Sequence, residues 1–330
     1  MSRKTRRRRA TRLGGLALIL ILAAAGLGVW SYAGPGPATK TVDVVLPKGG
    51  GVRRIAAALK DAGVIRSQTA FKVAARLTGA AGRLKAGEYE FPAGASTARV
   101  LADIAAGRFV RRFVVVPEGW TSEMAADAVR AAPLLTGDVE TPPEGSLLPD
   151  GYQYQRGEAR GAVLARMMKA RDDLLAQLWA ARAPDLPLKT PEEAATLASI
   201  VEKETGVPAE RPRIAAVFEN RLRAGMMLQS DPTIIYGLTK GRPLGHGILK
   251  SEKDAVTPYN TYHFAGLPPT PIANPGRASL EAVLNPPKTN ELYFVANGTG
   301  GHTFASTQAE HLANVDKWRA IERARAGASK

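Results

Sequence analysis

The feature that most constrains this chain is an uncharged run from Leu13 to Ala33, "LGGLALILILAAAGLGVWSYA". A membrane-spanning helix needs about 20 apolar residues, whereas the apolar core of a cleaved signal peptide has about 7–15. The preceding segment, "MSRKTRRRRATR", contains seven Lys and Arg, and such residues remain on the cytoplasmic side of a spanning helix. We therefore expect a cytoplasmic tail at 1–12, a transmembrane helix at 13–33 and an exported remainder. Cleavage near Ala23–Ala25 is the alternative.

Charge and composition exclude some kinds of site and bear on the kind of partner. The chain has 330 residues, a formal net charge of +15 and no cysteine, so thiolate catalysis, disulfides and Cys-based metal sites are excluded. The seven charges of the tail leave +8 on the rest of the chain, which suits an anionic cell-surface polymer or simply solvated surface charge. A nucleic-acid partner is not expected, because the arginines directly adjoin the spanning run as topology signals do.

Two other possible ligand sites do not meet their requirements. The four histidines show no tight ligand spacing, so no metal is expected. The segment "NGTGGH", at 297–302, is rich in glycine but has no P-loop lysine and lies between two strand-like runs. It predicts a hairpin turn instead of a phosphate-binding loop. We therefore expect no cofactor.

The exported part predicts an α+β fold in two domains. A linker at 34–40 precedes a small module at 41–109, in which two strand-like segments alternate with helices that begin at Ser67 and Ser96. The module has no catalytic constellation and is expected to bind or to act as a spacer. A larger mixed α+β domain follows at 110–322, with a short tail at 323–330. Within it, the proline- and glycine-rich segment 131–155 predicts a long loop.

The segment "KTPEEAATLASIVEKETG", at 189–206, carries a full set of helix signals. Thr190 is the expected N-cap, Pro191 the first helical residue, and Glu193 the partner in a capping box. On a helical wheel, Glu204 lies in the middle of the apolar stripe, whereas Glu202 lies on the opposite face. The pattern predicts that Glu204 points into the protein and that Glu202 is a surface residue.

A carboxyl group on an apolar face is desolvated, which raises its pKa towards the range that a general acid needs at neutral pH. Glu204 is therefore the candidate catalytic residue. The alternative is a structural ion pair with Arg221, which lies on the apolar face of the next predicted helix.

Longer motifs connect this helix with a known family. The run "ASIVEKETGVPAERPRIAAVFENRLRAGMMLQSDPTIIYGL" closely resembles the central motif of the endolytic murein transglycosylase (YceG-like) family. The segments "EGSLLPDGY", "TPYNTYHFAGLPPTPIANPGRASLEAVLNP" and "LYFVANGTGGHTF" resemble it too. The resemblance implies a cytoplasmic tail, a single spanning helix in the inner membrane, a LysM-like module at 41–109 and a periplasmic catalytic domain.

The resemblance also implies an activity. The family's catalytic glutamate corresponds to Glu204, and the enzyme would be a membrane-anchored lytic transglycosylase. It would cleave the MurNAc–GlcNAc bond inside glycan strands and leave 1,6-anhydroMurNAc ends during cell-wall assembly. Expected partners are peptidoglycan strands, the lipid bilayer through 13–33, and peptidoglycan synthases. The alternatives are a non-catalytic, membrane-anchored peptidoglycan-binding scaffold and a hydrolase that acts on the same bond.

Seven residues of the central run and of the later motifs are candidates for contacts with the sugar, because amides, hydroxyls and aromatic rings suit carbohydrate ligands. Ordinary turn structure is the alternative for each of them. Asp231 could also act as a second carboxylate, which would permit hydrolysis. The candidates are Gln229, Ser230, Asp231, Tyr236, Asn260, Tyr262 and Asn274.

Overall fold

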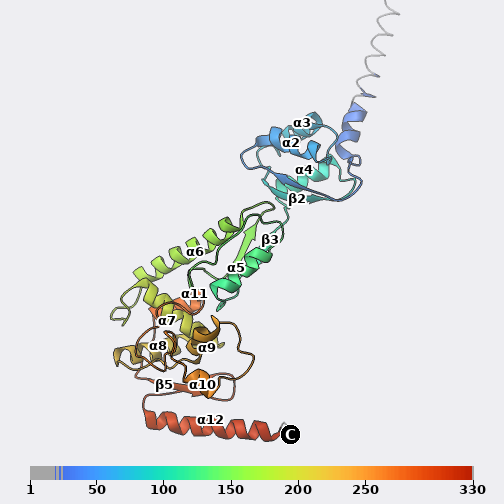
Figure 1. Cartoon of the computed structure of the whole chain (residues 1–330). Helices are drawn as coiled ribbons and strands as arrows, with labels where there is room; N and C mark the ends of the chain where they lie inside the picture. The colour runs from blue at the N-terminus through green and yellow to red at the C-terminus, as the bar shows by residue number, and fades with distance from the viewer. Residues whose placement is uncertain (1–18, 20–21, 24, 329–330) are drawn as a thin grey trace, which may run out of the picture. The chain divides into compact units, whose positions relative to one another are not determined.

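The structure, a computed structural model, describes residues 19, 22–23 and 25–328. Its contacts divide the chain into two compact units, Met1–Arg112 and Phe113–Lys330 (Figure 1). Much of the predicted transmembrane segment 13–33 lies outside the described residues. Among the residues that are described, no helix combines the length and the apolar character needed to cross a bilayer.

The first unit contains a two-stranded antiparallel sheet, in which β1 (Val42–Leu46) pairs with β2 (Gly87–Phe91). Between the strands come α2 (Gly51–Asp61) and α3 (Gln68–Leu77), and α4 (Thr97–Ala106) follows β2. The expected caps are present, because the Ser67 hydroxyl accepts a hydrogen bond from Ala70 N and that of Ser96 accepts one from Arg99 N.

The core of the first unit is apolar and aromatic. Phe71, Tyr89 and Phe91 are fully buried, and the rings of Tyr89 and Phe91 stack with their centroids 5.8 Å apart. This packing joins the helices to the small sheet, which is too narrow to be stable by itself. The α+β class expected from the sequence is confirmed for this unit.

The second unit begins with a region that corrects the sequence prediction. The two-stranded sheet of β3 (Arg112–Val115) and β4 (Gly151–Tyr154) packs with α5 (Ser122–Ala131) and α6 (Arg160–Ala180). Strand β4 lies inside segment 131–155, which was expected to be entirely loop. A strand of four residues that begins with a glycine gives little local signal. The pairing with β3 makes this segment a strand.

The helix that carries the two glutamates is the centre of the second unit. Helix α7 (Pro191–Glu204) packs against α6, α8 (Arg211–Arg223), α9 (Asp231–Thr239) and α11 (Arg277–Leu284). Eight consecutive residues of α7, from Ala194 to Val201, are buried. A helix that is enclosed on all sides has no free polar face. Short connecting helices are η1 (Pro208–Glu210) and α10 (Lys250–Lys253).

The chain ends with a hairpin and a long helix. β5 (Tyr293–Ala296) pairs antiparallel with β6 (His302–Ala305), so the expected turn at "NGTGGH" is confirmed. The final helix, α12 (Gln308–Ala328), packs against both strands of the hairpin. The α+β class is therefore confirmed for the second unit as well.

Candidate active site

Glu204 is the last residue of α7, so the helix presents its carboxyl group at its C-terminal end. The start of the helix follows the expected pattern, because the Thr190 hydroxyl accepts a hydrogen bond from Glu193 N at 3.1 Å. The Glu193 carboxylate bonds Lys189 N, one residue before the cap, so the capping box is formed with a shifted partner. These contacts at the start of α7 fix the rotation of the helix about its axis. That rotation determines the direction in which Glu204 points.

The environment of Glu204 suits a carboxyl group that stays protonated near neutral pH. The side chain is partly exposed, and Ser230 Oγ donates a hydrogen bond to its Oε1 at 2.5 Å. Burial raises the pKa of Glu204 to about 7, and the nearby charge of Asp231 acts in the same direction. The C-terminal end of a helix also disfavours a negative charge. The group is therefore desolvated yet open to a ligand.

A hydroxyl network holds Ser230 in place. Ser230 N donates to Thr261 Oγ1 at 3.0 Å, and the Thr233 hydroxyl bonds both Thr261 Oγ1 and Ser230 O. All three residues are buried. The network ties the start of α9 to the "PYNTY" loop, and in this way fixes the donor to Glu204.

A tyrosine of the same loop contacts a second acid, Asp231, which is the first residue of α9. The Tyr262 hydroxyl donates to Asp231 Oδ1 at 2.7 Å, and Asp231 is itself exposed. Gln229 is exposed beside them, with a left-handed backbone at φ +51. Four of the seven predicted contact residues, Gln229, Ser230, Asp231 and Tyr262, therefore lie together near Glu204.

The other three predicted contact residues are buried. The Asn260 amide donates to Lys253 O and Ala255 O, and only 1% of the residue is exposed. Asn274 is fully buried, and its side chain bonds Leu147 N at 2.9 Å and Trp120 O at 3.0 Å. Tyr236 is 6% exposed. We assign the two asparagines to loop structure, which was the alternative for each.

The alternative ion pair between Glu204 and Arg221 is not formed in the described structure. The Arg221 guanidinium donates instead to Leu228 O at 2.6 Å and to Leu292 O at 2.7 Å. Its charge lowers the pKa of Glu204, but less than burial raises it. Arg221 holds two backbone segments together and leaves the Glu204 carboxyl free of a cationic partner.

The prediction that Glu202 is a surface residue is wrong. Its side chain is only 4% exposed and forms an ion pair with Arg211 at 3.0 Å. Its other oxygen accepts a hydrogen bond from Gly276 N at 2.9 Å. The helical wheel failed here because α7 is covered on both faces, the second by residues distant in the sequence. Glu202 anchors the loop that contains Gly276.

The sequence motifs did not single out one acid of the second unit, Glu144, although it lies in the quoted "EGSLLPDGY" motif. Glu144 accepts hydrogen bonds from Ser122 N at 2.8 Å and from the Tyr236 hydroxyl at 3.2 Å. Burial raises the pKa of Glu144. An acid beside glycine in a turn-rich segment resembles a solvated loop residue, and only the packing against α9 distinguishes it. Among the described residues, no group of three His, Asp or Glu is arranged to hold a metal ion.

The fold and the site define an α+β domain with a partly exposed, desolvated carboxyl group at the end of a buried helix, and the comparisons with known proteins give its family. The sequence model of the YceG-like family matches residues 44–317, so the chain belongs to that family. A Bacillus subtilis (strain 168) protein named endolytic murein transglycosylase is 29% identical over 310 residues, which cover 84% of this chain and 85% of that protein.

Two further relatives agree with this family. A Streptococcus pneumoniae (serotype 2, strain D39) protein, also named endolytic murein transglycosylase, is 28% identical over 84% of this chain and 58% of its own length. The 2.6 Å crystal structure of a yceG-like protein from Listeria monocytogenes has a TM-score of 0.51 and 29% identity. The match covers 84% of this chain and 99% of the chain in that structure.

Proposed function

We propose that the protein is an endolytic lytic transglycosylase, which cleaves the MurNAc–GlcNAc bond inside peptidoglycan glycan strands. The observation that carries the proposal is the state of Glu204, a partly exposed carboxyl group with a pKa of about 7 and a hydrogen bond from Ser230. A general acid works best when its pKa lies near the working pH. The names of the relatives support the same substrate.

The first step is protonation of the leaving group. Protonated Glu204 donates its proton to the glycosidic oxygen as the bond from the MurNAc anomeric carbon to that oxygen breaks. The ring then carries positive charge, as in other glycosidic cleavages. The exposed carboxylate of Asp231, oriented by Tyr262 at 2.7 Å, is placed to stabilise that charge.

The second step closes a ring within the substrate. The C6 hydroxyl of the same MurNAc attacks the anomeric carbon and loses its proton to the Glu204 carboxylate. The product has a 1,6-anhydroMurNAc end, Glu204 is protonated again, and no water is consumed. An intramolecular nucleophile gains effective molarity, which can lower a barrier by roughly 7–11 kcal/mol.

The proposal includes the position of the enzyme in the cell. The uncharged run 13–33, preceded by seven Lys and Arg, supports a single-pass anchor in the inner membrane with a cytoplasmic N-terminus. The catalytic unit would then lie in the periplasm, beside its substrate and within reach of peptidoglycan synthases. N-terminal sequencing of the membrane-bound protein tests this, because a chain that begins near residue 26 would mean cleavage.

The deciding experiment is mass spectrometry of the saccharides released from purified glycan strands. We expect products that are lighter by one water than hydrolysed ends. A digest dominated by the heavier species would make the enzyme a hydrolase, with Asp231 as the base to examine next. Binding of strands without any cleavage would make the protein a scaffold. Glu204→Gln provides the inactive control, and Glu281→Gln, an exposed acid paired with Arg277, provides the matched active one.

A further inference from the structure

A pocket of about 400 Å³ lies beside α9, and the steps proposed above do not use it. Its volume is in the range of small-molecule sites. The lining combines two carboxylates with two cations, and the residues that matter for its chemistry are Glu123, Thr141, Glu144, Tyr236, Lys240 and Arg242. A pocket of this kind suits a ligand that carries both charges.

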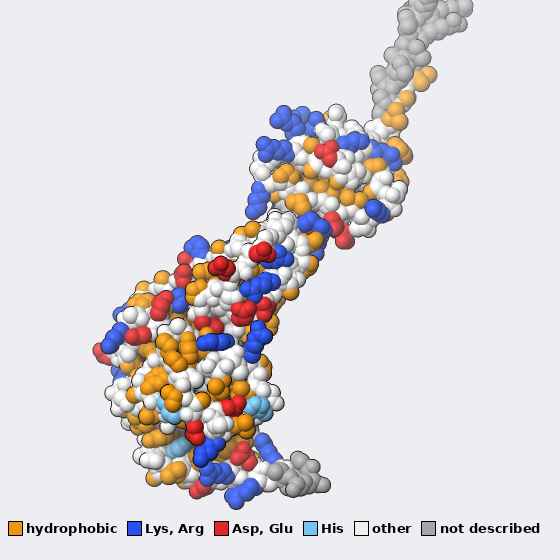
Figure 2. Space-filling view, in the orientation of Figure 1, with side chains coloured by type: hydrophobic (Ala, Val, Ile, Leu, Met, Phe, Trp, Pro, Cys, Tyr) orange, Lys and Arg blue, Asp and Glu red, His pale blue; other side chains and the backbone are white. Residues whose placement is uncertain are grey.

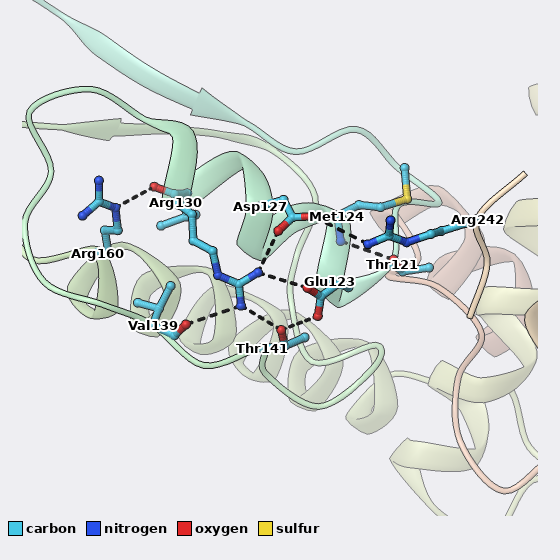
Figure 3. Close-up of polar contacts among 10 residues, drawn as sticks. Thr121, Glu123, Met124, Asp127, Arg130, Val139, Thr141, Arg160 and Arg242 are labelled. Carbon is cyan, nitrogen blue, oxygen red and sulfur yellow. Dashed lines mark hydrogen bonds and ion pairs between the residues drawn. The ribbon is translucent and has the colours of Figure 1, made fainter. Parts of the chain in front are cut away.

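One acidic wall is held rigidly. Figure 3 shows Glu123 and Thr141 turned towards each other, with the Arg130 guanidinium between Glu123 and Asp127. Arg130 Nη1 lies 3.1 Å from Glu123 and 2.7 Å from Asp127, and the Thr141 hydroxyl donates to Glu123 at 2.5 Å. These hydrogen bonds lower the pKa of Glu123. Glu123 is therefore ionised at neutral pH, with Arg130 as its ion-pair partner.

Glu144 is the second carboxylate of the pocket. Its oxygens accept hydrogen bonds from Ser122 N and from the Tyr236 hydroxyl, so neutral donors orient it and no cation neutralises it in these bonds. A carboxylate oxygen has two lone pairs, which leaves room for a further donor. A desolvated acid gains most from an incoming cation, because water competes weakly for it.

The cationic side is formed by the residues that follow α9. Lys240 Nζ lies 5.3 Å from the ring centroid of Tyr236 and 4.9 Å from that of Tyr259. Arg242 is largely exposed and lies 3.9 Å from Asp127, at the edge of contact distance (Figure 3). Gly241, the residue between these two in the sequence, packs closely against Thr121, because a Cβ there would lie 2.5 Å from Thr121 Cγ2. The turn thus holds both cations towards the pocket.

Helix α9 connects the pocket with the proposed catalytic acid. Helix α9 begins at Asp231, next to the Ser230 that bonds Glu204, and Tyr236 lies five residues further on. At 1.5 Å and about 100° per residue, this is roughly 7–8 Å along the helix and about 140° around it. An extended peptide spans about 3.3–3.6 Å per residue, so three residues reach about 10 Å. In peptidoglycan, MurNAc carries a peptide whose third residue is a diamino acid.

We infer that this pocket binds the stem peptide of peptidoglycan, with the side-chain ammonium of the diamino acid against Glu144 and Glu123. A peptide carboxylate pairs with Lys240 and Arg242. The inference rests on the proposed function for its substrate, and it adds that the enzyme recognises peptide-bearing strands and not only the glycan.

The experiment measures binding, so it gives a result whether or not cleavage is lytic. The full chain is titrated with the free tetrapeptide L-alanyl-γ-D-glutamyl-L-lysyl-D-alanine and with the same peptide acetylated on its lysyl side chain. We expect the acetylated peptide to bind at least about tenfold more weakly, because a hydrogen bond to a charged group is lost. Glu144→Gln should reduce this ratio to about one.

Two further variants complete the test. Lys240→Met, at an exposed position, should weaken both peptides equally and keep the tenfold ratio, because it removes the carboxylate contact. Glu281→Gln should bind as the wild type does. The inference is overturned if the wild type does not distinguish the two peptides, if Glu144→Gln still distinguishes them tenfold, or if Lys240→Met binds both with wild-type affinity. Failure of the proposed function appears separately, in the masses of the saccharide products.

Discussion

Residues 34–112 carry a formal net charge of +9, from 14 Lys and Arg against 5 Asp and Glu, whereas residues 113–330 carry −1, from 24 against 25. The excess of positive charge outside the N-terminal tail therefore belongs to the small unit. Figure 2 shows Lys and Arg side chains spread over the visible face of that unit, which contains α2, α3 and α4. A positive surface of this kind attracts anionic partners.

The interiors of the two units differ in the opposite direction. In the first unit, the described buried polar residues are few, namely Glu88, Thr97 and Asp103. The second unit buries many, and several of them gather around Ser230 and Asn274. Buried polar groups must all find partners, so they specify one arrangement of loops. The buried polar groups of the second unit therefore position its loops. The first unit has few such groups and is distinguished by its positive surface charge.

The largest expected effect is on catalysis by the second unit. Glu204→Gln should lower the rate of glycan cleavage about a thousandfold, because the amide can neither donate the catalytic proton nor accept one. The measurement is the rate of release of soluble saccharide. Substitution of exposed basic residues in the first unit should change this rate far less, and an equal loss would remove the contrast between the two units.

Unfolding is not expected to cause that loss, and the reason lies in the pKa of Glu204. Its folded pKa of about 7 lies above the ordinary value of 4.5. Ionisation therefore costs stability, and the cost grows as the pH rises from 4.5 through 7. Glu204→Gln removes this cost, so at pH 8 its free energy of unfolding should equal or exceed that of the wild type. Urea denaturation at pH 8 and at pH 4 checks the sign.

The pH dependence of cleavage is the next largest effect. Glu204 must be protonated to act as an acid, so the rate should fall about tenfold per pH unit above its pKa of about 7. Asp231→Asn removes a nearby charge that raises this pKa, so the alkaline limb should move to lower pH. An alkaline limb that does not move in this variant would show that another group controls it.

Substitution of Glu202 separates a positioning acid from the proposed catalytic acid, Glu204. Glu202→Gln removes the charge that pairs with Arg211 at 3.0 Å in a nearly buried site. We expect a loss of about 1–3 kcal/mol in the free energy of unfolding and a smaller loss of activity than for Glu204→Gln. Because the two groups interact, Glu202→Gln with Arg211→Gln should cost less than the sum of the single changes. Additive costs would contradict the pair.

Local sequence signals located most of the helices and the end of α7 that carries Glu204, the proposed catalytic residue. Thr190 and the apolar stripe were enough to place Glu204, because its surroundings come from its own helix and from the next motif. Glu202, Glu144 and strand β4 were misjudged or missed, since each depends on a partner distant in the sequence: Gly276 for Glu202, Tyr236 for Glu144 and β3 for β4. Periodicity describes one element at a time and says nothing about what covers its second face.

The smallest expected effect tests the charge of the first unit. Arg53, Arg54 and Lys60 lie on α2 and are exposed. Exposed ionic contacts contribute about 0.2–1 kcal/mol each and are screened by salt. Replacing the three residues with Gln should therefore weaken binding of the full chain to purified peptidoglycan about fivefold at low ionic strength.

The control for this last prediction comes from the second unit. Lys317, Arg319 and Arg323 on α12 are equally exposed, but they belong to a unit without excess positive charge. Their replacement with Gln should change binding less than the α2 variant does. At 1 M salt the Debye length is about 3 Å, so the difference between the variants should vanish. If the two triple variants lose the same affinity at low salt, total charge governs binding and not its concentration on the first unit.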